Sequence, residues 1–333
     1  MASKYTPSIN IIRDLNEDVA YFPTQNARLV AEQIETSFTA GIRVFNIIGS
    51  YGTGKSSFLW ALAQTLRGKK HFFDVKSLIR KKAEVIPLIG DYKSAFDFLG
   101  EKFVGDEKDI SEDDIFAEIY DHYHLLGNKD ALLILLIDEF GKFLEYAAKH
   151  NPEKELYFLQ QFAEFVNDPS YNIILITTLH QNFDAYAHSL TTNQRREWAK
   201  VKGRFQEITF NEPVEQLLSL AGQRLKQKDQ PIKRKEVQSA TSLFLKSKAF
   251  ALNPEFVSSL ALELYPLDLF SASIAAFAMQ VYGQNERSLF SFLESNDYTG
   301  LSGYDVRTNP FYNVANLYDY LIFNYYSFLT SKF

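Results

Sequence analysis

The sequence predicts an α/β fold, in which helices cover a parallel sheet, followed by a helical domain. Strand and helix patterns alternate from residue 42 to residue 210, which is typical of a parallel sheet with crossover helices. The aliphatic run at 131–137 has no polar alternation, so we expect a strand that is buried on both faces. From residue 211 onward only helical patterns follow. These observations divide the chain into an α/β core at 1–210 and a helical domain at 211–298.

The composition is that of a chain able to bury a large core, and its lack of cysteine is compatible with a reducing compartment. Its 333 residues suffice for two domains, and 46% of them are hydrophobic. The absence of cysteine excludes disulfides, thiolate catalysis and cysteine-bound zinc. The net charge of −6 gives no overall attraction for nucleic acid. The amino terminus has no signal-peptide pattern and the longest aliphatic run is seven residues, so we expect a cytoplasmic protein without a membrane span.

The core elements follow from hydrophobic spacing and capping residues. Thr24 is a helix N-cap candidate, and the apolar residues at helical spacing behind it are Leu29, Val30, Ile34 and Phe38. Strands are expected at 43–48, 85–89, 131–137, 172–182 and 205–210. Helices are expected at 56–66, twice within 93–125, after residue 139 and at 155–166. The order of strand, loop and helix at 43–66 sets the context of the first motif.

That motif is Gly49-x-x-x-x-Gly54-Lys55-Ser56, which fits the P-loop pattern in full. Glycines let successive backbone N–H groups point at one centre, and the helix N-terminus adds partial positive charge. Lys55 would reach the β- and γ-phosphates, and the Ser56 hydroxyl would contact Mg²⁺. The alternative is a glycine-rich turn that happens to precede a helix. The expected phosphate-binding residues are Gly49, Ser50, Tyr51, Gly52, Thr53, Gly54, Lys55, Ser56 and Ser57.

The second motif is Asp138-Glu139, at the end of the buried run 131–137. Two adjacent carboxylates at the end of a central strand are costly without a compensating cation. Asp138 is therefore a candidate Mg²⁺ ligand, and Glu139 a candidate to orient and activate the attacking water. The alternative is a strand that stops at a charged surface turn.

The strand at 172–182 also changes from aliphatic to polar at its carboxyl end. Ligands of open α/β sheets bind at that edge. Thr178 and His180 are therefore candidates to touch the γ-phosphate or its water. The alternative is a strand-end hydroxyl and a surface histidine.

Helices are expected beyond residue 211 at 233–250, 254–263, 267–282 and 285–294, after a first helix whose apolar face contains Val214, Leu217, Leu218, Ala221 and Leu225. The segment 299–333 is dense in Tyr and Phe and includes a helix with apolar residues on much of its surface. Such a helix must be buried against the helical domain, a protein partner or a further domain. We therefore expect 299–333 to be the start of another domain in a truncated or split chain.

These motifs make residues 20–297 resemble AAA+ ATPases, which have a P-loop core and a helical lid. Within that superfamily the lid resembles that of origin-recognition initiator ATPases. Through "GSYGTGKSSFL", "IDEFGKFLEY", "VKGRFQEITF" and "GQNERSLFSFL" the chain is also similar to ATP-binding proteins of bacterial phage-defence (BREX-type) islands. No residue distinguishes ATP from GTP, so ATP comes from the resemblance, with Mg²⁺ as its metal.

The resemblance assigns two arginines. Arg204 falls where the family often has an arginine finger for the neighbouring subunit, and Arg287 where a lid arginine touches the phosphates. The alternatives are a solvated basic run for Arg204 and a helix cap or ion pair for Arg287. The family's usual γ-phosphate sensor is asparagine, whereas this chain has Thr178 and His180.

The function predicted from these residues is Mg²⁺-dependent ATP hydrolysis coupled to conformational change and homo-oligomer assembly, in phage defence by the closer resemblance. One alternative is an assembly switch that binds ATP with little turnover. Another is a DNA-remodelling motor, favoured only by the basic segments 66–82 and 195–204. Small-molecule kinase activity is a more distant alternative.

Overall fold

The computed structural model describes residues 9–19, 21, 23–50, 53–80, 82–105, 109–127, 130–210, 214–226, 233–250, 252–282, 289–295 and 297–330. Contacts within the chain separate two compact units. The first comprises residues 1–50 and 54–211, and the second comprises residues 51–53 and 212–333. The first unit contains the α/β core.

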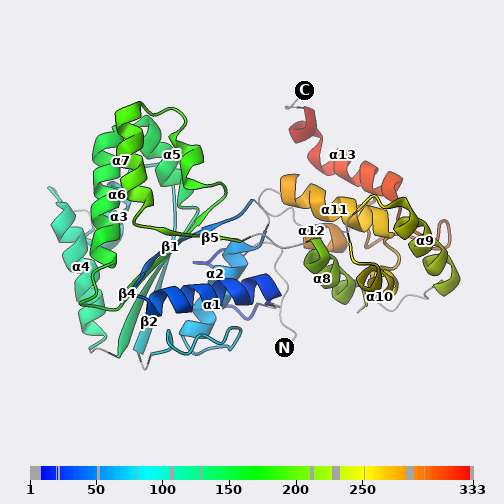
Figure 1. The fold of residues 1–333 in the computed structure, drawn as a ribbon, viewed down its shortest axis with the longest axis horizontal. Helices are drawn as coiled ribbons and strands as arrows, with labels where there is room; N and C mark the ends of the chain where they lie inside the picture. The colour runs from blue at the N-terminus through cyan, green and yellow to red at the C-terminus, as the bar shows by residue number, and fades with distance from the viewer. Residues whose placement is uncertain are drawn as a thin grey trace. The chain divides into compact units, whose positions relative to one another are not determined.

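The core of the first unit is a five-stranded parallel sheet (Figure 1). Its strands are β1 (Val44–Ile48), β2 (Lys82–Ile89), β3 (Ala131–Asp138), β4 (Ile173–Leu179) and β5 (Gln206–Thr209), in the spatial order β2-β3-β4-β1-β5. Every strand pair is parallel, so all five carboxyl ends lie at one edge. The predicted α/β fold with a parallel sheet is confirmed.

The position of each strand in the sheet follows from its residues. β3 and β4 are buried along their whole length, as expected for aliphatic strands covered on both faces. β2 pairs only with β3 and contains Pro87. Because proline cannot donate a ladder hydrogen bond, an edge strand is the place where it is tolerated.

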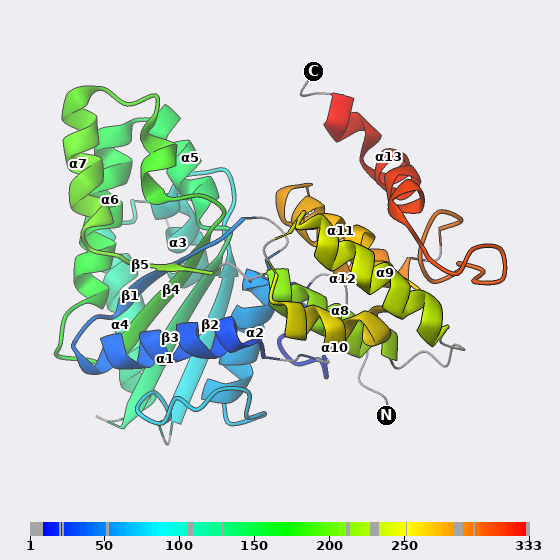
Figure 2. The same ribbon diagram turned by 45° about the vertical axis from the view of Figure 1, so that its right-hand side comes forward.

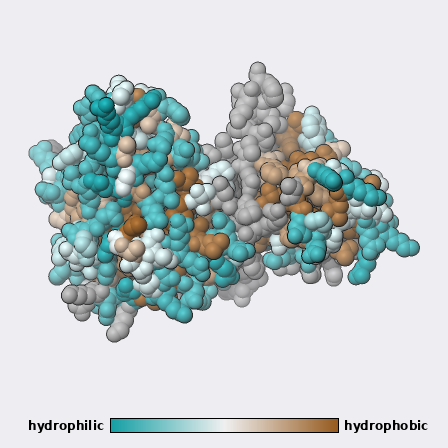
Figure 3. All heavy atoms as spheres, in the orientation of Figure 1, coloured by the Kyte–Doolittle hydropathy of each residue, from teal (hydrophilic) through white to brown (hydrophobic). Residues whose placement is uncertain are grey.

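Helices cover both faces of this sheet (Figures 1 and 2). On one face lie α1 (Gln25–Thr39) and α2 (Lys55–Leu66). On the other lie α3 (Ala95–Phe103), α4 (Glu112–Leu125), α5 (Gly141–Lys149), α6 (Pro152–Val166) and α7 (Thr192–Lys202), with the 3₁₀ helix η1 (Phe183–Ala187). The outward surface over α6 and α7 is mostly hydrophilic (Figure 3).

Two expectations about helices need correction. Leu29 was expected on the buried face of α1, but 55% of its surface is exposed, and Ala27, Val30, Ala31, Ile34 and Phe38 form that face instead. The basic segment 195–204 was not assigned to a helix, yet most of it forms α7. Only Trp198 and Val201 of α7 are buried, which is too few apolar residues to give a clear helical period.

The second unit is a helical assembly around a separate core. Its helices are α8 (Val214–Lys226), α9 (Arg234–Ser247), α10 (Pro254–Leu264), α11 (Leu269–Tyr282), α12 (Leu289–Glu294) and α13 (Val314–Thr330). The apolar face expected for α8 is present, with Leu217, Leu218, Ala221 and Leu225 buried and Val214 partly buried. Arg287, expected to touch the phosphates, lies outside the described residues.

The described part of 299–330 contributes to that same core. Leu301, Tyr312, Leu317 and Tyr320 are buried with residues of α8 to α12. The Tyr312 hydroxyl donates to the Thr299 carbonyl at 2.6 Å, and the Tyr312 N–H donates to the Pro266 carbonyl at 2.9 Å. Within the described part of the chain, no helix combines the length and the apolar character that a membrane crossing requires.

Candidate functional site

The first part of the site is the loop between β1 and α2. The Gly49 N–H donates to the Leu179 carbonyl at 3.1 Å, which ties the start of the loop to the end of β4. Gly54 precedes α2 with φ 87°, a left-handed conformation that L side chains rarely adopt. α2 then begins at Lys55, so its first N–H groups face the loop. Tyr51 and Gly52 lie outside the described residues.

The Lys55 ammonium lies beneath this loop. Its Nζ donates to the Gly49 carbonyl at 2.5 Å and to the Ser50 carbonyl at 2.8 Å. Burial lowers the pKa of Lys55 to about 8, while the negative charges of Asp138 and Glu139 act in the opposite direction. The lysine of the loop and the two carboxylates after β3 therefore belong to one electrostatic site.

The register of the sheet brings the second and third motifs to this loop. Ile47 of β1 lies opposite Thr178 of β4, and Ile137 of β3 lies opposite Thr177 of β4. Asp138 ends β3 and is only 6% exposed. The carboxyl ends of β1, β4 and β3 thus lie side by side in that order.

Thr178 connects the two carboxylate positions. Its hydroxyl donates to Oδ1 of Asp138 at 2.5 Å and accepts from the Glu139 N–H at 2.9 Å. The Glu139 N–H also donates to Oδ1 of Asp138 at 3.1 Å. Because this hydroxyl both donates and accepts here, Thr178 fixes the geometry of Asp138 and Glu139.

Glu139 has an unusual backbone conformation. Its φ is 56°, which costs a non-glycine residue roughly 1 kcal/mol. A Cβ on Gly90, just beyond β2, would lie 2.5 Å from the Glu139 carbonyl oxygen, so the turn after β3 depends on a glycine there. The Glu139 carboxylate forms an ion pair with Lys142 at 2.5 Å, in which both side chains are about half exposed. Such a pair is worth at most about 1 kcal/mol, so it restrains the carboxylate only weakly.

His180 completes the group at this edge. Burial lowers its pKa, while Glu145 and Glu139 raise it and Lys55 lowers it further, so the ring lies within the field of the loop and of Glu139. The Tyr186 hydroxyl lies 3.2 Å from Nδ1, and Glu145 lies 3.7 Å from Nε2. A Cβ on Gly141 would meet the Tyr186 hydroxyl at 2.2 Å, so that glycine admits the tyrosine.

Arg204 lies elsewhere. It precedes β5, whose carboxyl end lies beside that of β1, so Arg204 is at the opposite edge of the sheet from Lys55. Its Nε and Nη2 donate to Oε1 of Glu164 at 2.9 and 2.6 Å. The hydrogen bonds from Arg204 hold the pKa of Glu164 below its usual value. Within one chain, Arg204 is thus not part of the loop site.

The structure therefore brings together Lys55, Asp138, Glu139, Thr178 and His180, with Ser56 and Ser57 in the first turn of α2. Sequence reasoning missed Lys142, Tyr186 and the close approach at Gly90. Only the glycines of "LIGDY" and "EFGKF" pointed to them, because a glycine that cannot be replaced marks a backbone or side chain at short range.

Comparisons with known proteins show similarity at the level of structure only. No protein-family model and no curated protein sequence matches the chain. Among solved structures, a chain from Drosophila ORC bound to DNA is 12% identical with a TM-score of 0.46, over 96% of this chain and 66% of that one. The Aeropyrum pernix ORC2 protein in its ADPNP–ADP complexes is 12% identical with a TM-score of 0.41, over 98% and 82%. PCH-2 of C. elegans is 15% identical with a TM-score of 0.34, over 70% and 57%. Similarity at this level assigns no activity, which must come from the site itself.

The lowered pKa of Lys55 predicts a pH-dependent stability. Because its pKa is about 8 in the folded chain and 10.5 in the unfolded one, the cost of the buried ammonium is fully present below pH 8 and disappears as the pH rises to 10.5. Wild type should therefore gain stability relative to Lys55→Met between these pH values, by roughly 3 kcal/mol or less. Urea unfolding at several pH values measures this difference. Lys200→Met, at an exposed position, serves as the control, and a pH-independent difference for Lys55→Met would contradict the buried ammonium.

Proposed function

We propose that this chain is a P-loop ATPase of the AAA+ type, which binds Mg–ATP at the carboxyl edge of its parallel sheet and hydrolyses it. The observation that carries the proposal is that the charges of Asp138 and Glu139 act on Lys55, which is the first residue of α2 and follows the glycine-rich loop. A cation beside the N-terminus of a helix suits phosphates, and the carboxylates suit a metal ion and a water molecule. The choice of ATP over GTP rests on the sequence resemblance.

Phosphate binding would use the loop 49–57 and Lys55. The Lys55 ammonium now bonds two loop carbonyls, which are neutral acceptors. Phosphate oxygens are charged acceptors and form stronger hydrogen bonds. Exchange of carbonyls for phosphate oxygens therefore favours binding, and it raises the pKa of Lys55 back toward its ordinary value.

The residues present fit a Mg²⁺ ion held jointly with phosphates. Mg²⁺ in phosphate sites is bound by one or two carboxylates together with the phosphates, so Asp138 alone could supply the carboxylate. The hydrogen bonds from Thr178 and the Glu139 N–H both go to Oδ1 of Asp138, which leaves Oδ2 as the atom for the ion or its water. Ser56, in the first turn of α2, would be the second ligand. When bound, the ion would neutralise charge on the phosphate oxygens.

Hydrolysis would use Glu139 as the group that orients and deprotonates the attacking water. Its weak pair with Lys142 must open first. His180, with its lowered pKa, is neutral at pH 7 and would contact the γ-phosphate or the water through one ring nitrogen. Thr178 would act as a positioning residue, because its hydroxyl is already committed to Asp138 and the Glu139 N–H.

The single-site test of this mechanism separates binding from chemistry. Glu139→Gln should bind a fluorescent ATP analogue as wild type does but hydrolyse ATP about 10²–10⁴-fold more slowly, since it keeps the shape and loses the base. Lys55→Ala should lose nucleotide binding. Steady-state phosphate release and equilibrium binding measure the two effects. Glu153→Gln, at an exposed position on α6, is the matched control, and unchanged hydrolysis in Glu139→Gln would refute the assignment and favour an assembly switch.

We propose further that hydrolysis is completed between subunits by Arg204. Its position at the edge opposite to Lys55 prevents it from serving its own site but allows it to serve a neighbour's. The pair with Glu164 is half exposed and weak, so a γ-phosphate on a neighbouring subunit can compete for the guanidinium. A positioned guanidinium is worth about 10³–10⁵ in the rate of phosphoryl transfer.

This shared site predicts that activity depends on protein concentration. Specific ATPase activity should rise with concentration in wild type, and Arg204→Ala should abolish the rise without affecting nucleotide binding. Glu164→Ala should raise activity at low concentration, because Arg204 is then released. Arg196→Ala, exposed on α7, is the control. Activity that is flat with concentration, together with a silent Arg204→Ala, would show that the chain works alone.

A role of this ATPase in phage defence rests on the sequence resemblance, and loss of plaque protection in Glu139→Gln would be its test.

A further inference from the structure

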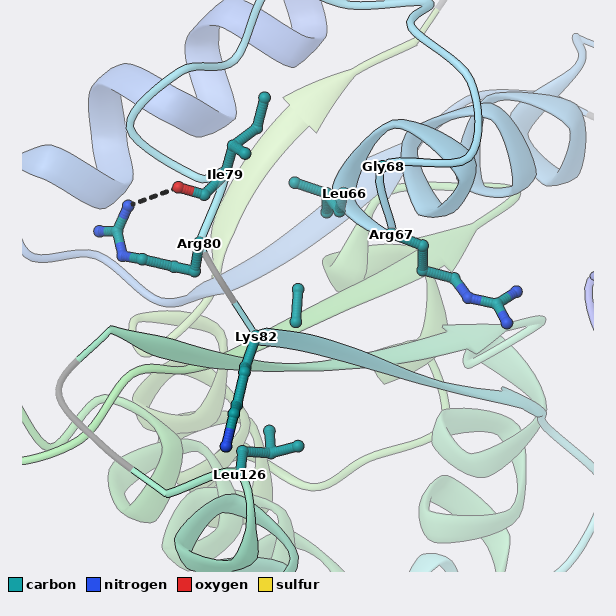
Figure 4. Close-up of a pocket in the computed structure, with 8 residues that line it drawn as sticks. Leu66, Arg67, Gly68, Ile79, Arg80, Lys82 and Leu126 are labelled. Carbon is teal, nitrogen blue, oxygen red and sulfur yellow. Dashed lines mark hydrogen bonds between the residues drawn. The ribbon is translucent and has the colours of Figure 1, made fainter.

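A cavity of about 460 Å³ lies at the edge of the sheet opposite to Lys55 (Figure 4). It is built where α2 ends, where β2 begins and where α4 ends. The residues that line it are Leu66, Arg67, Gly68, Ile79, Arg80, Lys82, Ala83 and Leu126. All of them belong to the first unit, and none belongs to the proposed nucleotide site.

The charge of this lining is entirely positive. Arg67, Arg80 and Lys82 are its charged residues, and no carboxylate is among the lining residues. The Arg67 guanidinium donates to the Leu15 carbonyl and to the Asn16 side chain, both at 3.3 Å, and the Arg80 guanidinium donates to backbone carbonyls of residues 77 and 79. Among the described residues, none of these three cations forms an ion pair with a carboxylate, whereas nearby Lys70 and Lys76 do. No carboxylate of the described residues thus competes with a ligand for these three cations.

Apolar side chains form part of the lining. These are Leu66, Ala83 and Leu126, with Ile79, whose surface is 41% exposed. Leu125, the neighbour of Leu126 in the sequence, is 81% exposed, the largest such value among the large hydrophobic residues of the first unit that the structure describes. Exposed apolar side chains around a concavity are typical of protein interaction sites.

The charged groups of the three cations point away from one another (Figure 4). Figure 4 shows the guanidinium groups of Arg67 and Arg80 on opposite sides, with Lys82 extending beside Leu126. A single phosphate group would need cations that converge on one point. Separated cations beside apolar side chains instead match a ligand with an apolar group and separated negative charges.

We propose that this cavity binds a short acidic peptide segment of a partner protein, with one large apolar side chain in the cavity and flanking carboxylates on Arg67, Arg80 and Lys82. Burial of the apolar side chain would supply affinity. Pairing of carboxylates with the guanidinium groups would supply orientation and a faster association. Nucleic acid fits less well, because the described lining has no aromatic side chain on which a base could stack.

The site would recruit a partner without blocking the nucleotide. It uses the amino end of β2, whereas Asp138, paired with the last residue of β2, lies at the other end of the same strand pair. Peptide binding and nucleotide binding are therefore separable, and a failure of one proposal leaves the other testable.

A random peptide display library selected on the full chain tests the proposal. Enriched peptides should place Asp or Glu on both sides of a Leu, Ile, Phe or Trp. Fluorescence anisotropy of an enriched peptide should show binding that weakens with salt and falls at least about tenfold in the charge-reversal variant Arg67→Glu, Arg80→Glu, Lys82→Glu. Ala83→Phe, which fills the cavity without changing charge, should weaken binding to a similar extent.

Controls separate this result from general effects. Reversal of Lys149, Lys200 and Lys235 to Glu, three exposed lysines outside the cavity, should change binding less than about twofold. Lys55→Ala should bind the peptide as wild type does, and circular dichroism unfolding should show that the variants fold. The proposal is overturned if enriched peptides lack acidic residues, if none is enriched, or if folded cavity variants bind them normally. It is also overturned if single-stranded DNA binds the same three cations and displaces the peptide.

Discussion

Parallel pairing of β1, β4 and β3 is the constraint on which the proposed site depends. The register sets the ends of these three strands side by side, so the loop after β1, the polar residues at the end of β4 and the carboxylates at the end of β3 meet at one edge. No single motif could form the site alone. A one-residue shift in either ladder would turn Asp138 or Thr178 to the other face, because side chains alternate along a strand.

The electrostatic property that distinguishes this edge is a partly buried ammonium close to two carboxylates. The Lys55 ammonium is partly buried and donates to two backbone carbonyls. Its pKa is nevertheless lowered, because these carbonyls stabilise the ammonium less well than water or an anion would. Asp138 and Glu139 offset part of that cost from across the loop. Burial of the Lys55 ammonium therefore costs free energy in this structure, and a phosphate ligand would offset that cost. The left-handed backbone at Glu139 is a second local cost at the same edge.

Much of this arrangement could be predicted from the sequence. The rest depends on side-chain contacts that hydrophobic spacing and motifs do not indicate. The glycine-rich loop and the aliphatic run before Asp138 specify strand ends directly, so their positions were expected. The side chains that contact Glu139 and His180 were not expected. Lys142 pairs with Glu139 three residues earlier in the turn after β3, and Tyr186 fits only because residue 141 has no side chain. Leu29 and α7 were misjudged because one helix carries more apolar residues than its buried face uses, and the other carries almost none.

Proton uptake on nucleotide binding tests the central claim most directly. Calorimetric titration with a non-hydrolysable ATP analogue and Mg²⁺ at pH 8, in two buffers of different ionisation enthalpy, reports the protons bound. Since a fraction of the Lys55 groups is neutral near a pH equal to the pKa, wild type should take up a measurable fraction of a proton as phosphate restores the ammonium. Lys55→Arg, which cannot lose its proton, should bind without uptake. Binding without uptake by wild type, or equal uptake in Lys55→Arg, would contradict a Lys55–phosphate contact.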